Sequence, residues 1–199
     1  MAVKQEQRRR QTIRLLIETT RDLVLEKGCP SVTMQDIMNR SGLSKGAIFH
    51  YVKSKDEIFV RLLDERLEET NARFMQEIEQ GRRTFEEPMK VIRESIVAYG
   101  QAHDVTNKVL TYLLGKEDDP VVAAALKRYY ERSVALSRTW IETGQRHGRT
   151  PVAVDAETTA ELFVLLTFGL RVRASIPDAK AVLSGDDLAS FIADKLNPR

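Results

Sequence analysis

The stretch TMQDIMNRSGLSKGAIFHYV, residues 33–52, has the pattern of two short helices separated by a tight turn. Thr33 and Asp36 stand at the spacing of a capping box, with the short Asp side chain in place of the usual Glu. Gly42 lies in a Ser-Gly-Leu turn, where a positive φ costs glycine little, and Ser44 is suited to cap the second helix. The stretch therefore predicts a helix-turn-helix.

The two faces of this motif differ in polarity. Ile37, Leu43 and Ile48 are expected to anchor the motif in the core. A helix N-terminus with free N–H groups suits a phosphate, and an α-helix fits the DNA major groove. We therefore expect DNA contacts from the other face of the second helix and from the start of the next one. These residues are Ser44, Lys45, Gly46, Ala47, His50, Tyr51 and Lys55.

The distribution of charge is consistent with a polyanionic partner. Residues 1–55 hold eleven Lys and Arg against five Asp and Glu, whereas residues 56–199 hold twenty against twenty-four. A basic N-terminal part on an acidic body is an electrostatic pattern of nucleic-acid-binding proteins. An excess of this size is equally consistent with a solvated surface, so the charge alone does not decide between the two.

Helical periodicity continues along the rest of the chain, with Gly, Pro and capping residues between the periodic segments. Ser54 and Glu57 have the spacing of a full capping box, and Asp186 or Asp187 is expected to cap the last helix. The sequence thus predicts an all-α protein without strands. The nine expected helices cover about 8–27, 34–40, 45–51, 55–80, 85–103, 105–114, 120–144, 156–175 and 187–196.

The motif and the helix after it resemble the TetR family of bacterial transcriptional repressors. The resemblance rests on TxxDI at 33–37, SGLSKGAIFHYV at 41–52 and KxE at 55–57, and the nine-helix layout extends it to the whole chain. It implies a DNA-binding domain over 10–70 and a ligand-binding and dimerisation domain over 71–199. It further implies a homodimer that binds palindromic operator DNA and releases it when a small molecule enters the C-terminal domain.

The resemblance also implies which residues face DNA. Two of these DNA-facing residues depart from the family pattern. Phe49 stands where Tyr is often found. Gln35 stands where Arg is frequent, and this difference changes base preference. Met38 and Ser41 replace alanines that are common at the contact between the two helices. The implied DNA-facing set is Thr33, Gln35, Ser44, Lys45, Gly46, Phe49, His50, Tyr51 and Lys55.

The C-terminal part has aromatic and polar residues on the inner faces of its expected helices. Each aromatic alone is more simply a core residue, but together they favour a cavity for a small apolar or aromatic effector. For Arg171 and Arg173, near the end of this cavity, solvent exposure is a simpler expectation than contact with an anionic group. The candidate ligand contacts are Tyr99, His103, Trp140, Phe163 and Thr167.

The eighth expected helix is apolar on more than one side, which requires burial on opposite faces. With the family resemblance, this pattern predicts that the last two helices pair with their copies in a homodimer. The candidate interface residues are Leu162, Leu166, Leu170, Phe191 and Ile192.

Other kinds of site and of function receive less support from the sequence. Cys29 is the only cysteine, and an inert packed thiol is the simpler interpretation. The three histidines lack metal-ligand spacing, and no nucleophile elbow or phosphate loop is present, so we expect no metal, no cofactor and no enzyme. No secretory or membrane-spanning stretch is visible, which favours a cytoplasmic protein without membrane contacts.

Three alternative functions stay open at this point. The chain could be an activator of the same family. It could be a helical adaptor whose basic part meets a protein or an anionic membrane. It could also be a helical enzyme that acts on a small molecule.

Overall fold

The computed structural model describes residues 2–80 and 85–197, with side chains from residue 5 onward. Within these ranges the chain forms nine helices and no strand, as the sequence predicts. The helices are α1 (Ala2–Ser31), α2 (Met34–Ser41), α3 (Lys45–Phe49), α4 (Lys55–Glu79), α5 (Glu86–Tyr99), α6 (Val105–Leu114), α7 (Pro120–Arg146), α8 (Ala156–Ala174) and α9 (Gly185–Leu196).

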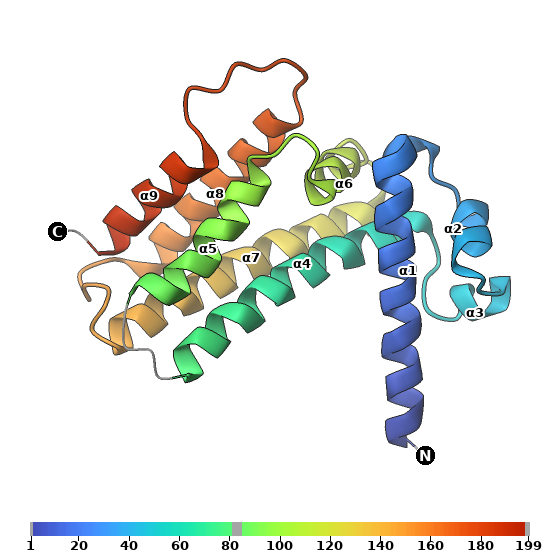
Figure 1. Ribbon diagram of the computed structural model, residues 1–199, viewed down its shortest axis with the longest axis horizontal. Coiled ribbons are helices and arrows are strands. Elements are labelled where there is room, and N and C mark those ends of the chain that lie inside the picture. Colours follow the sequence, from blue (N-terminus) through green and yellow to red (C-terminus); the bar gives the residue numbers. More distant parts are fainter. Residues whose placement is uncertain (1, 81–84, 198–199) are drawn as a thin grey trace.

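The helices form two connected parts (Figure 1). α1 stands across one end of the molecule, with α2 and α3 on its outer side. α4 and α7 run together from this end to the other, where α5 packs on α4, α8 packs on α7 and α9 packs on α5. None of the helices in the described ranges is long and apolar enough to cross a membrane.

The local signals of residues 33–52 act as expected. The Asp36 N–H donates to Thr33 Oγ1 at 3.1 Å and the Thr33 N–H donates to Asp36 Oδ2 at 2.8 Å, which completes the capping box. Gly42 ends α2 with φ at 68°. Ser44 Oγ accepts from the Ala47 N–H at 3.2 Å and starts α3. α3 has five residues, fewer than expected.

Several helix ends differ from the expected ones. The helical run of α1 is interrupted at Gly28, whose φ is 76°, but one further turn follows to Ser31. α5 ends at Tyr99, although apolar periodicity continues beyond it. The capping box before α4 is incomplete, because the Glu57 carboxylate accepts from the backbone N–H of Lys53 and not from the backbone N–H of Ser54. α9 is capped by Ser184, not by Asp186 or Asp187.

The buried side chains form two hydrophobic clusters. One joins α1–α4 with α6 and the first half of α7, and the other joins α5, the second half of α7, α8 and α9. Because α6 packs on α1 and α4, the first cluster contains residues from both sides of the expected boundary near residue 70. The two-domain division of the chain stays a prediction.

Gly185 allows α9 to lie close to α5. A Cβ atom at this position would stand 2.8 Å from Val97 Cα and 3.0 Å from Ile96 O, both backbone atoms of α5. Because backbone cannot move aside as a flexible side chain can, Gly185→Ala is expected to lower the free energy of unfolding by about 1–3 kcal/mol.

Chemical denaturation followed by circular dichroism measures this change. Gly115→Ala is the matched control, because its Cβ would meet no atom closer than 3.7 Å. Equal stability of the two variants would show that the approach of α9 to α5 is not tight.

Candidate DNA-binding surface and internal cavity

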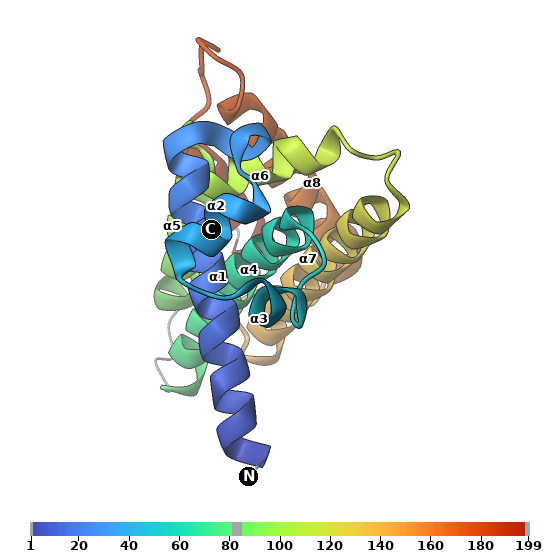
Figure 2. The ribbon, with the colours of Figure 1, turned by 90° about the vertical axis from the view of Figure 1, so that its right-hand side faces the viewer.

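α3 is held from behind and exposed in front. Ile48 on α3 and Ile37 on α2 are fully buried, which fixes the orientation of α3 on the core. Figure 2 shows α3 at the outer surface of this end of the molecule. The outward side carries the exposed residues Ser44, Lys45, Gly46, Phe49 and His50, with Tyr51 half-buried beside them.

This surface is both cationic and apolar, because exposed Phe49 lies beside Lys45. The Lys45 Nζ atom lies 5.9 Å from the centroid of the Phe49 ring, one helical turn away. Apart from the adjacent residues and the backbone of α3 itself, no atom lies within 4 Å of the position that a Cβ of Gly46 would take, so the backbone there is open to a partner. The DNA-facing role of these residues stays a prediction.

Thr33 and Gln35 reach the same end of the molecule from the first turn of α2, and both are exposed. The Gln35 amide donates to Asn39 Oδ1 at 2.8 Å. The nearby Asp36 carboxylate is paired with Lys27 Nζ at 2.6 Å. Hydrogen bonds from Lys27 and Thr33 lower the pKa of Asp36 to about 2, so its charge is present at neutral pH but neutralised locally.

Lys55 has a structural task that the sequence did not predict. Its ammonium group donates to the carbonyl oxygens of Cys29 at 3.1 Å, Pro30 at 3.1 Å and Val32 at 2.7 Å. An ammonium has three N–H donors, so all of them are used in closing the end of α1. In this conformation Lys55 has no donor left for a DNA phosphate.

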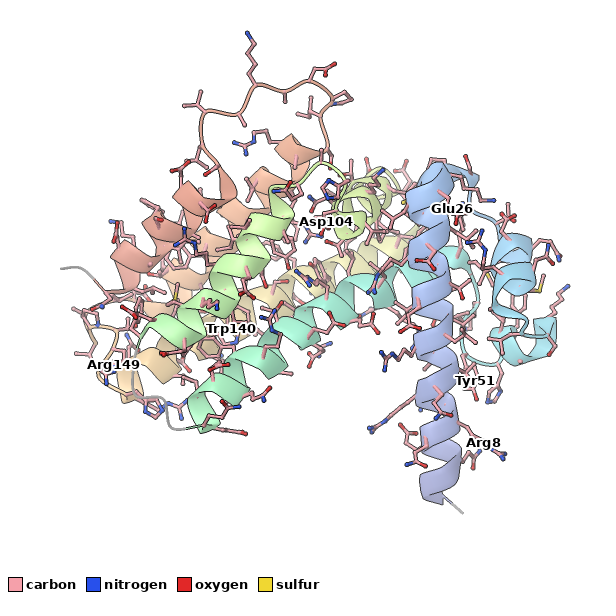
Figure 3. The ribbon with its side chains drawn as sticks, in the orientation of Figure 1. Arg8, Glu26, Tyr51, Asp104, Trp140 and Arg149 are labelled. Carbon is pink, nitrogen blue, oxygen red and sulfur yellow. The ribbon has the colours of Figure 1, made fainter. Side chains whose placement is uncertain are left out.

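The first half of α1 adds residues that were not predicted from the sequence. α1 extends beyond α3 (Figure 3), and Arg8 and Arg9 line shallow depressions together with His50 and Tyr51. The run of three arginines at 8–10 is a visible signal in the sequence. Only the tertiary fold shows that this run lies beside α3, because the two segments are far apart in the chain.

The second feature is a cavity of about 660 Å³ lined by α4, α5, α7, α8 and α9 and by residues of the adjoining loops. Its size is within the range of small-molecule sites. Tyr99, Trp140, Phe163 and Thr167 line it, so the structure brings four of the five candidate ligand residues together. His103 is exposed in the loop after α5 and does not line the cavity, because the helix that would have carried it inward ends at Tyr99.

Most polar groups of the cavity wall are bonded within the wall. Thr70 Oγ1 and Ser95 Oγ lie 3.1 Å apart, and the Trp140 indole N–H donates to Asn71 Oδ1 at 3.0 Å. Thr167 Oγ1 donates to the Val164 carbonyl at 2.9 Å. The middle of the cavity is therefore largely apolar. Burial raises the pKa of Tyr99 to about 12, so its hydroxyl stays protonated.

Arg171 closes one end of the cavity, contrary to the expectation that it is exposed to solvent. Arg171 is only 2% exposed. Its Nε donates to Asn107 Oδ1 at 3.0 Å, and the two Nη atoms donate to the Tyr129 hydroxyl at 2.7 Å and to the Thr106 carbonyl at 3.0 Å. Arg173, two residues later, is half-buried and donates to the Leu183 carbonyl at 2.6 Å.

The predicted dimerisation residues are divided between surface and core. Leu162 and Phe191 are exposed, Leu166 is half-buried, and Leu170 and Ile192 are buried within one protomer. α8 exposes two further apolar residues that were not predicted from the sequence, Leu165 and Val172. The exposed α8 residues 162, 165 and 172 follow helical spacing and form one stripe.

The reactive groups considered in the sequence are the Cys29 thiol and possible metal ligands. Cys29 is buried, and burial raises the pKa of its thiol to about 11, which fits an inert packed thiol. Among the described residues, no cluster of three or more His, Cys, Asp or Glu side chains is arranged to hold a metal ion.

The sequence of the N-terminal part matches a known family. Residues 16–62 match the family described as bacterial regulatory proteins, tetR family. The nucleoid occlusion factor SlmA of Actinobacillus pleuropneumoniae is 27% identical over 123 residues, which are 61% of this chain. The match spans 59% of the length of that relative.

Solved structures show the same fold over almost the whole chain. A TetR-family transcriptional regulator from Syntrophomonas wolfei aligns with a TM-score of 0.69 and 15% identity, covering 94% of this chain and 93% of its own. A transcriptional regulator from Saccharomonospora viridis in complex with choline aligns with a TM-score of 0.63 and 21% identity, covering 92% of this chain and 94% of its own.

Proposed function

We propose that this chain is a ligand-responsive repressor, because it carries the helix-turn-helix domain and the all-helical fold of the tetR family of bacterial regulatory proteins. Two copies bind a palindromic operator through their α3 helices, and a small molecule in the cavity releases the DNA. The proposal is a regulator and not an enzyme. The observation that carries it is α3 itself, a short helix with a buried back and an open, cationic front.

The exposed stripe on α8 supports the dimer in this proposal. Leu162, Leu165 and Val172 lie on one side of α8, and Phe191 is exposed on the neighbouring α9. An exposed apolar patch of this kind marks an interaction site. In the proposed dimer a two-fold axis passes through this patch and the two α3 helices share one duplex, which requires a palindromic site with half-sites about one helical turn or a small multiple apart.

α4 supplies a physical link between the cavity and the DNA-binding surface. Its 25 residues span about 37 Å at ~1.5 Å per residue. Ile58, Phe59 and Leu62 at its start pack in the N-terminal core, whereas Thr70 and Phe74 near its end line the cavity. A ligand that binds better to one position of α4 than to another shifts the equilibrium between two spacings of the two α3 helices. The size of this shift is set by the difference in affinity.

The choline complex of the Saccharomonospora viridis regulator supports the ligand-binding part of the proposal, since that protein has the same fold. The nature of the ligand in this chain is a separate question, which the residues of its own cavity address.

The roles of two lysines are separable by the salt dependence of DNA binding. Lys45→Ala is expected to weaken binding to every sequence and to reduce the slope of log K against log salt by about 0.9 for each phosphate that is no longer neutralised. Lys55→Ala is expected to lower the melting temperature while leaving the slope unchanged, because its ammonium bonds only to carbonyls of the chain.

Fluorescence anisotropy of a labelled duplex between roughly 50 and 300 mM salt measures both slopes. The two variants are matched controls for each other. An unchanged slope for Lys45→Ala would remove Lys45 from the DNA-binding surface.

A further inference from the structure

We propose that the cavity binds an organic anion, a carboxylate with an apolar body, and that Arg171 holds its charged group. This inference rests on the proposed function in taking the cavity as the effector site. It goes further by assigning the chemical class of the ligand, which is opposite in charge to choline.

The charged residues that line the cavity are all basic or imidazole side chains. Arg171 lies at the inner end, and Arg146, His147 and Arg149 lie at the other end. No Asp or Glu of the described residues belongs to the cavity wall. A cationic ligand would therefore meet like charge at both ends and no wall carboxylate to pair with, whereas an anion would meet an arginine at each end.

Arg171 is a buried cation without a bonded carboxylate. Its three hydrogen bonds go to an amide oxygen, a hydroxyl and a backbone carbonyl, all of them uncharged. Asp104 acts on it electrostatically, but the Asp104 carboxylate accepts from the N–H and hydroxyl of Thr106 and from the N–H of Asn107. A charge buried in this way is stabilised most by a bonded counter-ion.

Arg171 also keeps donors for such a counter-ion. A guanidinium has five N–H groups, and the structure uses one on Nε and one on each Nη atom. One N–H therefore remains on each Nη atom, so the guanidinium keeps two donors for a carboxylate.

Two phenols add donors at the same place. The Tyr129 hydroxyl accepts from Arg171 at 2.7 Å, so its own proton is available to a ligand. The Tyr99 ring stacks on the guanidinium, with its centroid 4.6 Å from Arg171 Cζ. The Asn107 amide donates to the Tyr99 backbone carbonyl, which leaves the Tyr99 hydroxyl without a hydrogen bond to the described residues. The polar end of the cavity thus offers donors, as a carboxylate requires, and burial raises the pKa of Tyr99 to about 12, which keeps its phenol a neutral donor.

The rest of the cavity fits an apolar body. Phe74, Trp140 and Phe163 form the wall between the two cationic ends. The distance along α7 from Tyr129, which lies beside Arg171, to Arg146 at the exposed end is about 26 Å at ~1.5 Å per residue. The labelled Asp104, Trp140 and Arg149 mark this direction in Figure 3. A ligand with its carboxylate on Arg171 therefore extends its apolar part toward Trp140.

Trp140 provides the measurement, because it is the only tryptophan of the chain and lines the cavity. Its fluorescence would be titrated at neutral pH with two matched pairs, decanoate against decanamide and 4-phenylbutyrate against 4-phenylbutyramide. We expect at least one carboxylate to bind ten times or more tightly than its amide. Equal binding within both pairs, or no binding by either carboxylate, would overturn the proposal.

Variants of two arginines locate the charge contact. Arg171→Met is expected to abolish the preference for the carboxylate, whereas Arg173→Met, on the same helix but outside the cavity wall, is expected to keep it. Circular dichroism shows whether each variant folds. Tyr99→Phe is the second variant, because it removes one unbonded hydroxyl and should weaken carboxylate binding without affecting the amide. A preference that survives in folded Arg171→Met would overturn the assignment.

A separate DNA arm distinguishes this inference from the proposed function. If the carboxylate binds and also releases operator DNA, both stand. If it binds with the expected preference and leaves DNA affinity unchanged, the ligand class stands and the effector role falls. Absence of both carboxylate preferences in a protein that still binds its operator would overturn the ligand class alone.

Discussion

Leu165→Asp is expected to convert the proposed dimer into monomers and to lower operator affinity at least about 100-fold. Leu165 is 54% exposed in one protomer and lies in the middle of the apolar stripe on α8. In a two-fold dimer each substitution occurs twice, and burying an unpaired carboxylate costs several kcal/mol. A monomer also holds only one half-site, so DNA binding weakens together with dimerisation.

Sedimentation velocity and operator titration measure the two effects in the same samples. Val121→Asp is the matched control, because it also replaces an exposed aliphatic side chain by a carboxylate, at a 74% exposed position on α7 and not on α8. The control should remain dimeric and bind DNA normally. A Leu165→Asp variant that stays dimeric at micromolar concentration would show that α8 does not form the interface.

Gly46→Glu is expected to abolish operator binding while leaving the fold intact. No atom lies within 4 Å of the new Cβ position, so the side chain fits the free protein. A carboxylate in the first turn of a helix also interacts favourably with the helix dipole. Facing DNA, however, the same carboxylate repels phosphate and occupies the closest approach of the backbone, so we expect at least about a 100-fold loss of affinity.

This variant separates function from stability because the two effects have opposite signs. Thermal denaturation should show an unchanged or slightly higher melting temperature for Gly46→Glu. Gly115→Glu is the control for the added charge, since its Cβ would make only ordinary contacts at 3.7 Å and beyond. Wild-type affinity of the folded Gly46→Glu variant would show that the start of α3 does not face DNA.

The end of the fold that carries α2 and α3 could be predicted in detail because its signals are local. Thr33 with Asp36, Gly42 and Ser44 each act within four residues of their own position, and all of them act as expected. The same local reasoning failed where two candidates compete. Ser184 has Asp187 as its capping-box partner, and this pairing overrides the expected Asp cap of α9.

The cavity was only partly predictable, because its walls come from five helices distant in sequence. Tyr99 and Trp140 could be recognised from the inner stripes of their helices. The burial of Arg171 could not, since its partners Asn107 and Tyr129 lie 64 and 42 residues away. Apolar periodicity placed His103 on the cavity side, but periodicity alone does not show where a helix ends.

The task of Lys55 shows a similar limit. The resemblance to a family places a lysine near DNA, and the structure places its ammonium on three carbonyls at the end of α1. Those acceptors are created by the break in α1 near Gly28. Their positions in space cannot be derived from the spacing of residues in the sequence.

The proposed mechanism requires that two copies of α3 read one duplex together. Selection of duplexes from a random pool by the purified full-length protein tests this requirement without intermediate assumptions. We expect enrichment of an inverted repeat whose half-site centres are about one turn or a small multiple apart. We also expect a preference for that sequence of at least ~1,000-fold over random DNA. A pool in which no sequence is enriched would contradict the mechanism.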